Sequence, residues 1–263
     1  MNITKLVPTF LITIFATIAV IYTFQFSRLL GNTLFLLPPF VAVIAGAYTV
    51  RTYRLANVHG KAMALFTAGL LCLLTGEFIF YLFQFVFHTD PFPSIADIFY
   101  LAAYPLLFAG FVKEIRIHKV NWRTFDKLVL VLVTLLLLTL AIIVSYFGIY
   151  LAYDAGNSLI ANIIAIAYGV GDLILIVPSL FILKIALDYR GGKLFYSWTL
   201  MLLAVMFMMA GDILFAIYSN EYTELVWPYT MIDLTWVVSY LCFAYSFSYT
   251  STTIRALHTK LLK

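Results

Sequence analysis

The chain has 263 residues, of which 64% are apolar, 17% aromatic and only 11% charged. Soluble domains carry about 25% charged residues, so this composition, with a mean hydropathy of +1.02, excludes a water-soluble fold, a disordered chain and a nucleic-acid-binding module. The 16 basic against 12 acidic residues are too small an excess to indicate a polyanionic partner. Cys72 and Cys242 both lie in apolar runs, so we expect neither a disulfide framework nor a CxxC metal site. We predict an all-α, polytopic protein of the lipid bilayer.

Apolar runs long enough to cross a membrane follow one another along the chain. A spanning helix needs roughly 20 mostly apolar residues. The runs are too long and too uniformly apolar for barrel strands, which alternate over about 10 residues. The eight predicted transmembrane helices are 6–27, 34–52, 62–87, 94–112, 128–152, 158–186, 194–218 and 226–249.

The positions of Lys and Arg predict the direction in which these spans cross. Of the 16 basic residues, only Arg28 lies on the side away from the two chain ends. The other breaks on that side contain no Lys or Arg but do contain Asp90, Asp154, Glu221 and Glu224. Because cytoplasmic loops are enriched in Lys and Arg, we expect an even number of spans, with both termini cytoplasmic, in the cell membrane.

The two halves of the chain share an order of polar residues that apolar composition alone does not produce. A glycine–acid pair, a proline, and an acid followed by two aromatic residues recur in sequence. The matched positions are Tyr53-Arg54 with Tyr189-Arg190, Gly76-Glu77 with Gly211-Asp212, Pro93 with Pro228, Asp97 with Asp233, Tyr100 with Trp236, and Tyr104 with Tyr240. We predict two parallel four-helix repeats, 1–122 and 123–263, the second with a short basic cytoplasmic tail. Their symmetry axis is expected to run along the membrane normal.

Five acidic residues lie inside predicted spans at depths that no Lys, Arg or His shares. Each ionised acid at the bilayer centre costs about 2.5–3.5 kcal/mol, so protonation, a polar cavity, hydrogen bonds or a bound cation must offset this cost. In the predicted topology all five fall in the outer half or the centre of the membrane. We predict that they line a ligand-binding cavity that opens outward. They are Glu77, Asp97, Asp172, Asp212 and Asp233.

Aromatic residues accompany these acids at helical spacing. Two follow Asp97, two follow Asp233 at the same intervals, and one precedes Asp172 by a turn. A carboxylate among Tyr and Trp rings can hold a cation or amine, or the phenols can satisfy a buried acid by hydrogen bonding. Asp97 and Asp233 follow prolines, so they can also cap helix starts. The aromatic members of the predicted ligand-binding set are Tyr100, Tyr104, Tyr168, Trp236 and Tyr240.

The histidines give no metal-ligand set. His59, His118 and His258 fall in predicted cytoplasmic segments, and His88 is too far along its helix from Glu77 to share an ion. A zinc site needs three or four close ligands, and no GxSxG, P-loop or HExxH motif occurs. We expect neither a bound metal nor a cofactor.

Two segments, Pro93–Leu107 (PSIADIFYLAAYPLL) and Ala167–Leu175 (AYGVGDLIL), resemble a multi-helix membrane sensor module of prokaryotic signalling proteins. In those proteins the module precedes a GGDEF, EAL or histidine-kinase domain. The resemblance covers most of the third to eighth spans and implies a sensory, receptor-like role for a small or lipidic ligand. The last predicted span ends at 249 and the sequence at 263. With no output domain here, signalling is expected to need a separate partner at the cytoplasmic face.

A weaker similarity is to the lysoplasmalogenase-like membrane hydrolases. These are also small eight-helix proteins with Gly-Asp motifs inside spans, here Gly171-Asp172 and Gly211-Asp212. The similarity implies that Asp172 and Asp212 activate water to cleave a lipid ether or ester, with one acid kept protonated by the other. A small-solute or proton-coupled carrier is a third interpretation, suggested by the parallel repeats and buried acids. Whether the chain is an enzyme is left open.

Overall fold

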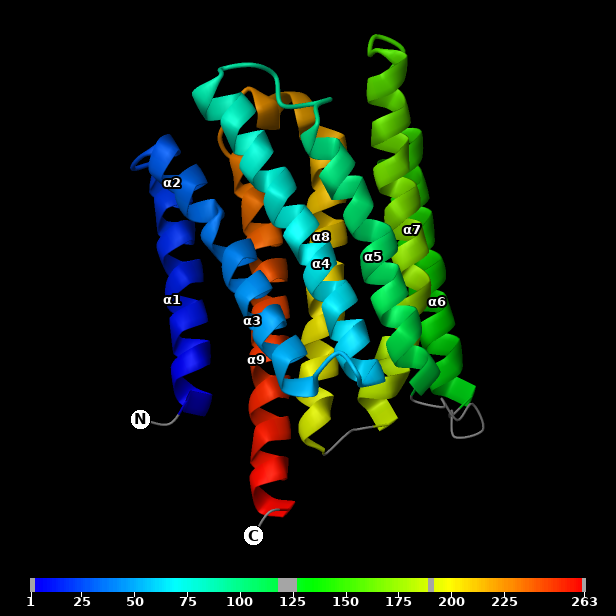
Figure 1. Cartoon of the computed structure of the whole chain (residues 1–263). Helices are drawn as coiled ribbons and strands as arrows, with labels where there is room; N and C mark the ends of the chain where they lie inside the picture. The colour runs from blue at the N-terminus through cyan, green and yellow to red at the C-terminus, as the bar shows by residue number, and fades with distance from the viewer. Residues whose placement is uncertain (1–2, 118–126, 189–191, 262–263) are drawn as a thin grey trace.

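The computed structural model describes residues 3–117, 127–188 and 192–261, and the regular structure of this part of the chain is all helical (Figure 1). This confirms the predicted all-α class. The α-helices are α1 (Ile3–Phe24), α2 (Arg28–Phe35), α3 (Leu37–Tyr53), α4 (Val58–Tyr81), α5 (Ala96–Ile117), α6 (Lys127–Ile143), α7 (Leu159–Asp188), α8 (Lys193–Thr223) and α9 (Asp233–Leu261). Shorter segments are the π-helical η1 (Leu82–Val86) and η3 (Val144–Tyr150) and the 3-10 turn η4 (Tyr229–Ile232).

Seven of the described helical segments are long and apolar enough to cross a membrane. In the region predicted to span at 128–152, the described apolar helix is the shorter segment Leu138–Tyr150. The outer surface is strongly apolar: Ile12 is 66% exposed, Ile142 68% and Leu159 76%. Large apolar surfaces of this kind mark contact with a membrane or a partner. The membrane environment is therefore confirmed, and the eighth crossing stays a prediction.

Six of the described helices form a closed ring in which each packs against two neighbours. From α3 the contacts run to α4, α5, α7, α8 and α9 and then back to α3. Helix α1 packs against α9 and helix α6 against α7, both outside this ring (Figure 1). Inside the bundle, buried rings such as Phe66 of α4 and Phe111 of α5 meet edge to face, with centroids 4.8 Å apart. The ring matters for function because its helices direct side chains into one common interior.

The start of α1 and the end of α9 lie at the same end of the bundle, the lower end in Figure 1. The connection between α3 and α4, which carries Arg54, lies at this end as well. The segments that join η1 to α5, η3 to α7 and α8 to η4 lie at the opposite end. Several predicted features lie outside the described residues: Lys119, Arg123, the repeat boundary at 122–123, and the matched pair Tyr189-Arg190.

Helix α9 is longer than predicted. The sequence analysis ended the last span at 249, whereas the helix continues to Leu261. No Gly or Pro follows Asp233, so nothing in the sequence interrupts the helix. The Arg255 guanidinium on the extension lies 4.5 Å from the centroid of the Tyr48 ring on α3, a cation–π distance. The predicted basic tail is therefore helical as far as Leu261.

Candidate ligand-binding site

A cavity lies inside the ring of helices. Its lining includes Phe92 and Asn157, which belong to connections at the upper end of the bundle in Figure 1. The volume of the cavity is about 120 Å³. Because a water occupies about 30 Å³ of liquid, the cavity has room for about four waters or a small molecule of similar size. The predicted site residues that line it are Glu77, Asp97, Tyr100, Tyr104, Tyr168, Asp172, Asp212, Trp236 and Tyr240.

Glu77 of α4 is held by phenols from two other helices. Tyr100 of α5 donates to its Oε2 at 2.8 Å, and Tyr240 of α9 donates to its Oε1 at 2.8 Å. The neighbouring Gly76 allows the Tyr100 ring to lie against the α4 backbone, because a Cβ there would be 2.7 Å from Tyr100 Cε1. Both carboxyl oxygens of Glu77 are thus satisfied by neutral donors.

Asp172 of α7 and Asp212 of α8 form a carboxyl pair. The Tyr104 hydroxyl of α5 lies 3.1 Å from Asp172 Oδ1 and 3.0 Å from Asp212 Oδ2. Trp236 of α9 donates its indole N–H to Asp212 Oδ1 at 2.9 Å. The Tyr104 hydroxyl therefore bridges the two carboxyl groups. Side chains from four helices of the ring therefore meet at this pair.

Asp97 makes both a helix-start contact and a hydrogen bond to a phenol, the two possibilities that the sequence left open. At the start of α5 its Oδ2 accepts the Ser94 backbone N–H at 2.6 Å, which is a helix-start contact. Its Oδ1 accepts the Tyr168 hydroxyl of α7, also at 2.6 Å. The acid therefore helps to fix the start of α5 and joins α5 to α7 at the cavity wall.

Asp233 does not line the cavity, which differs from the predicted position. It is the first residue of α9, and its carboxyl group is buried against α1 and α8. Its Oδ1 accepts the Tyr222 hydroxyl at 2.5 Å, and its Oδ2 accepts the Tyr22 hydroxyl of α1. Asp233 therefore attaches α1 to the ring. The sequence analysis missed both tyrosines, although Tyr22 lies near the outer end of the first predicted span, at about the predicted depth of Asp233.

The cavity is acidic and aromatic. None of its lining residues in the described part of the chain is a Lys, Arg or His. Phe80, Phe92 and Phe215, which the sequence analysis did not select, add aromatic walls. Among the described residues, no group of three or more His, Cys, Asp or Glu is placed to hold a metal ion. The arrangement favours a small organic cation as ligand.

This fold and this site define a helical membrane protein with an internal acidic and aromatic cavity. No family model matches the chain, and no curated protein or solved structure matches it either. The function therefore has to be argued from the cavity itself.

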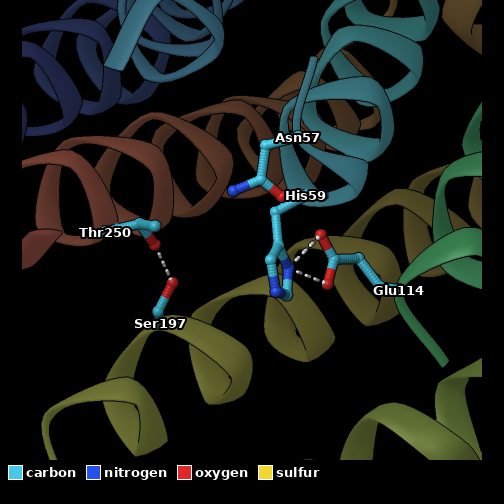
Figure 2. Close-up of polar contacts among 5 residues, drawn as sticks. All are labelled: Asn57, His59, Glu114, Ser197 and Thr250. Carbon is cyan, nitrogen blue, oxygen red and sulfur yellow. Dashed lines mark hydrogen bonds and ion pairs between the residues drawn. The ribbon is translucent and has the colours of Figure 1, made fainter. Parts of the chain in front are cut away.

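A second polar cluster lies at the start of α4 and the end of α5 (Figure 2). Glu114 is fully buried, and its Oε1 and Oε2 lie 3.2 and 2.9 Å from Nδ1 of His59. Asn57 caps α4 by accepting the His59 backbone N–H at 3.0 Å, so the turn that starts the helix also positions the imidazole. Nearby, Ser197 of α8 and Thr250 of α9 share a hydrogen bond. The sequence analysis did not select Glu114, because a pair separated by 55 residues leaves no local pattern.

We expect His59→Ala to lower the free energy of unfolding by about 1–3 kcal/mol, because the buried Glu114 loses a hydrogen bond to a chargeable group. Thermal unfolding of the purified protein in detergent, followed by circular dichroism, measures the change. His88→Ala is the matched control, since His88 is exposed, and it should leave Tm at the wild-type value. Equal Tm values for both variants would show that the His59–Glu114 contact does not stabilise the fold.

Proposed function

We propose that this chain is a receptor-like integral membrane module that binds a small ligand in the cavity, from the outer side of the cell membrane. One observation supports this most strongly: four predicted acids and five predicted aromatic residues, from α4, α5, α7, α8 and α9, line one cavity. Ionisable residues at membrane depth are costly and usually functional. The cavity volume of about 120 Å³ favours a small molecule over a whole lipid.

The charge distribution supports an orientation with both termini in the cytoplasm. Arg51, Arg54 and Lys61 flank the connection between α3 and α4, at the end of the bundle where α1 begins and α9 ends. Arg28 begins α2, at the opposite end. Because cytoplasmic connections are enriched in Lys and Arg, we infer that the cavity lies toward the outside. The orientation also requires α6 and η3 to form an eighth crossing.

The helix ring supports the proposed duplication. Pairing α3 with α7, α4 with α8 and α5 with α9 maps every contact of the ring onto another one. The glycines follow the same pairing, since Gly76 lies against the Tyr100 ring and Gly211 against the Trp236 ring. The cavity would then lie between the two repeats, close to their symmetry axis.

Filling the cavity tests the proposed function. Ala216 of α8 lines the cavity, and Ala216→Trp is expected to occupy the ligand's space. Ala47→Trp is the matched control, because Ala47 is exposed on α3. After gentle detergent extraction, native mass spectrometry should find a bound small molecule on the wild type and on Ala47→Trp but not on Ala216→Trp. A wild type that carries nothing, or the same bound mass on all three proteins, would contradict the proposal.

A second candidate is an intramembrane lipid hydrolase, and the carboxyl groups of Asp172 and Asp212, which share the Tyr104 hydroxyl, favour it. A protonated and an ionised acid side by side can serve as general acid and general base for an attacking water. This candidate predicts release of a fatty aldehyde from a lysoplasmalogen by the purified protein. Asp172→Asn and Asp212→Asn should each abolish the release without unfolding the protein.

A further inference from the structure

This inference rests on the proposed function and names the ligand class of the same cavity. We propose that the cavity binds a small organic ammonium ion and releases one proton from the Asp172–Asp212 pair when it does so. The ligand class follows from the charge and shape of the lining. The proton follows from the hydrogen-bond stoichiometry at Tyr104.

The lining favours an organic cation over other small ligands. Four carboxyl groups face the cavity, and the described lining residues include no basic side chain to neutralise them. Aromatic side chains such as Phe80, Phe215 and Trp236 form much of the remaining wall. Ring faces attract alkylammonium groups and give a hydrated metal ion few oxygen ligands. A neutral ligand would gain from the rings but would gain no attraction from the carboxyl groups.

The contacts around Tyr104 show that the carboxyl pair holds a proton when no cation is present. The phenol has a single proton, yet its oxygen lies 3.1 Å from Asp172 Oδ1 and 3.0 Å from Asp212 Oδ2. The indole N–H of Trp236 can only donate, so Asp212 Oδ1 is an acceptor. A phenol that donates to one acid must accept a proton from the other, and like charges this close disfavour ionisation of both acids, so one of them carries a proton. Asp172 is the better proton carrier, because it is 1% exposed and has no indole donor.

Charge balance then couples the proton to the cation. Without ligand the pair carries one proton and a charge of −1. When an ammonium ion enters, the Asp172 O–H bond breaks, the proton leaves to water, and the pair at −2 with the cation at +1 restores the same net charge. Affinity for the cation should therefore rise by about tenfold per pH unit over the pH range in which the empty site holds the proton.

Several other titratable groups face the pair. Glu77 of α4, Tyr168 of α7 and Tyr240 of α9 interact electrostatically with Asp212, and Tyr104 of α5 contacts both acids. The nearby π-helical segment η3 contributes Gly148 to the lining, and neither α6 nor η4 contributes a lining residue within the described part of the chain. The ligand's charge therefore acts mainly on acids and phenols, and the paired acids are placed to lose the proton.

Choline and its uncharged carbon analogue 3,3-dimethylbutan-1-ol test the proposal, because they match in size and differ in charge. Titration calorimetry of the full chain in detergent, in two buffers of different ionisation enthalpy, reports both the affinity and the protons released. We expect choline to bind at least about tenfold more tightly than the alcohol and to release about one proton. Choline that binds no more tightly than the alcohol, or binds without releasing a proton, would overturn the inference.

Two variants test whether the released proton comes from Asp172. Asp172→Asn imitates the protonated acid, so it should fold normally and bind choline without releasing a proton. Asp90→Asn changes an exposed acid outside the cavity and should behave like the wild type. Proton release that persists in Asp172→Asn would place the proton elsewhere and overturn the assignment. If choline fails but Ala216→Trp still removes a bound molecule, the ligand class is wrong and the proposed function stands.

Discussion

Gly171→Ala is expected to displace the Tyr104 ring and to disable the carboxyl pair. A Cβ at this position would lie 2.6, 2.7 and 2.8 Å from three atoms of that ring, well inside van der Waals contact. The ring is buried between α5 and α7, so it cannot retreat without moving its hydroxyl away from Asp172 and Asp212. Overpacking of this kind costs about 1–3 kcal/mol, and we expect choline affinity to fall by at least about tenfold.

Gly148→Ala is the matched control for this change. Gly148 also lines the cavity, but a Cβ there would meet its nearest atom, the Cα of Gly169, at an ordinary 3.5 Å. Thermal unfolding and choline titration of the two variants should therefore differ, with Gly148→Ala near the wild type. If both variants behaved alike, close packing of Tyr104 on α7 would not be what organises the site.

The members of the candidate site were predictable because polar residues are rare in membrane-spanning segments. An acid within an apolar run has a large solvation cost, so Glu77, Asp172 and Asp212 could be selected without knowing the fold. Helical periodicity then pointed to Tyr100 and Tyr104 on the face of α5 that lines the cavity. The spans were predictable for the same reason, since an apolar run of sufficient length has few alternatives in a bilayer.

The pairing of these residues was not predictable, because it depends on which helices are neighbours. Consecutive elements usually lie side by side, yet α5 packs against α7 in the ring while α6 lies outside it. That contact brings Tyr168 to Asp97, a pair 71 residues apart in the sequence. The position of α1 is another such case, because nothing in the sequence showed that Asp233 would contact Tyr22 of α1 and not a ligand in the cavity.

The contact between Asp233 and α1 leads to the largest stability effect that we expect from a single substitution. Asp233→Ala removes the acceptor of the buried Tyr222 phenol and leaves the buried Tyr22 phenol only the longer contact of 3.4 Å to Asn32 Oδ1. A buried polar group left without a partner costs about 1–3 kcal/mol, and a lost hydrogen bond about 0.5–1.5 kcal/mol, so the free energy of unfolding should fall by about 2–4 kcal/mol. Thermal unfolding in detergent measures the change, and Glu224→Ala, which removes an exposed acid, should leave Tm unchanged.

A combined variant distinguishes lost hydrogen bonds from a lost binding site. Adding Tyr22→Phe and Tyr222→Phe to Asp233→Ala removes the unsatisfied hydroxyls, so part of the stability should return. Because Asp233 does not line the cavity, choline affinity of the folded triple variant should stay near the wild-type value. An Asp233→Ala protein with normal Tm and weakened choline binding would instead return this acid to the ligand site, and α1 would then need another anchor to the ring.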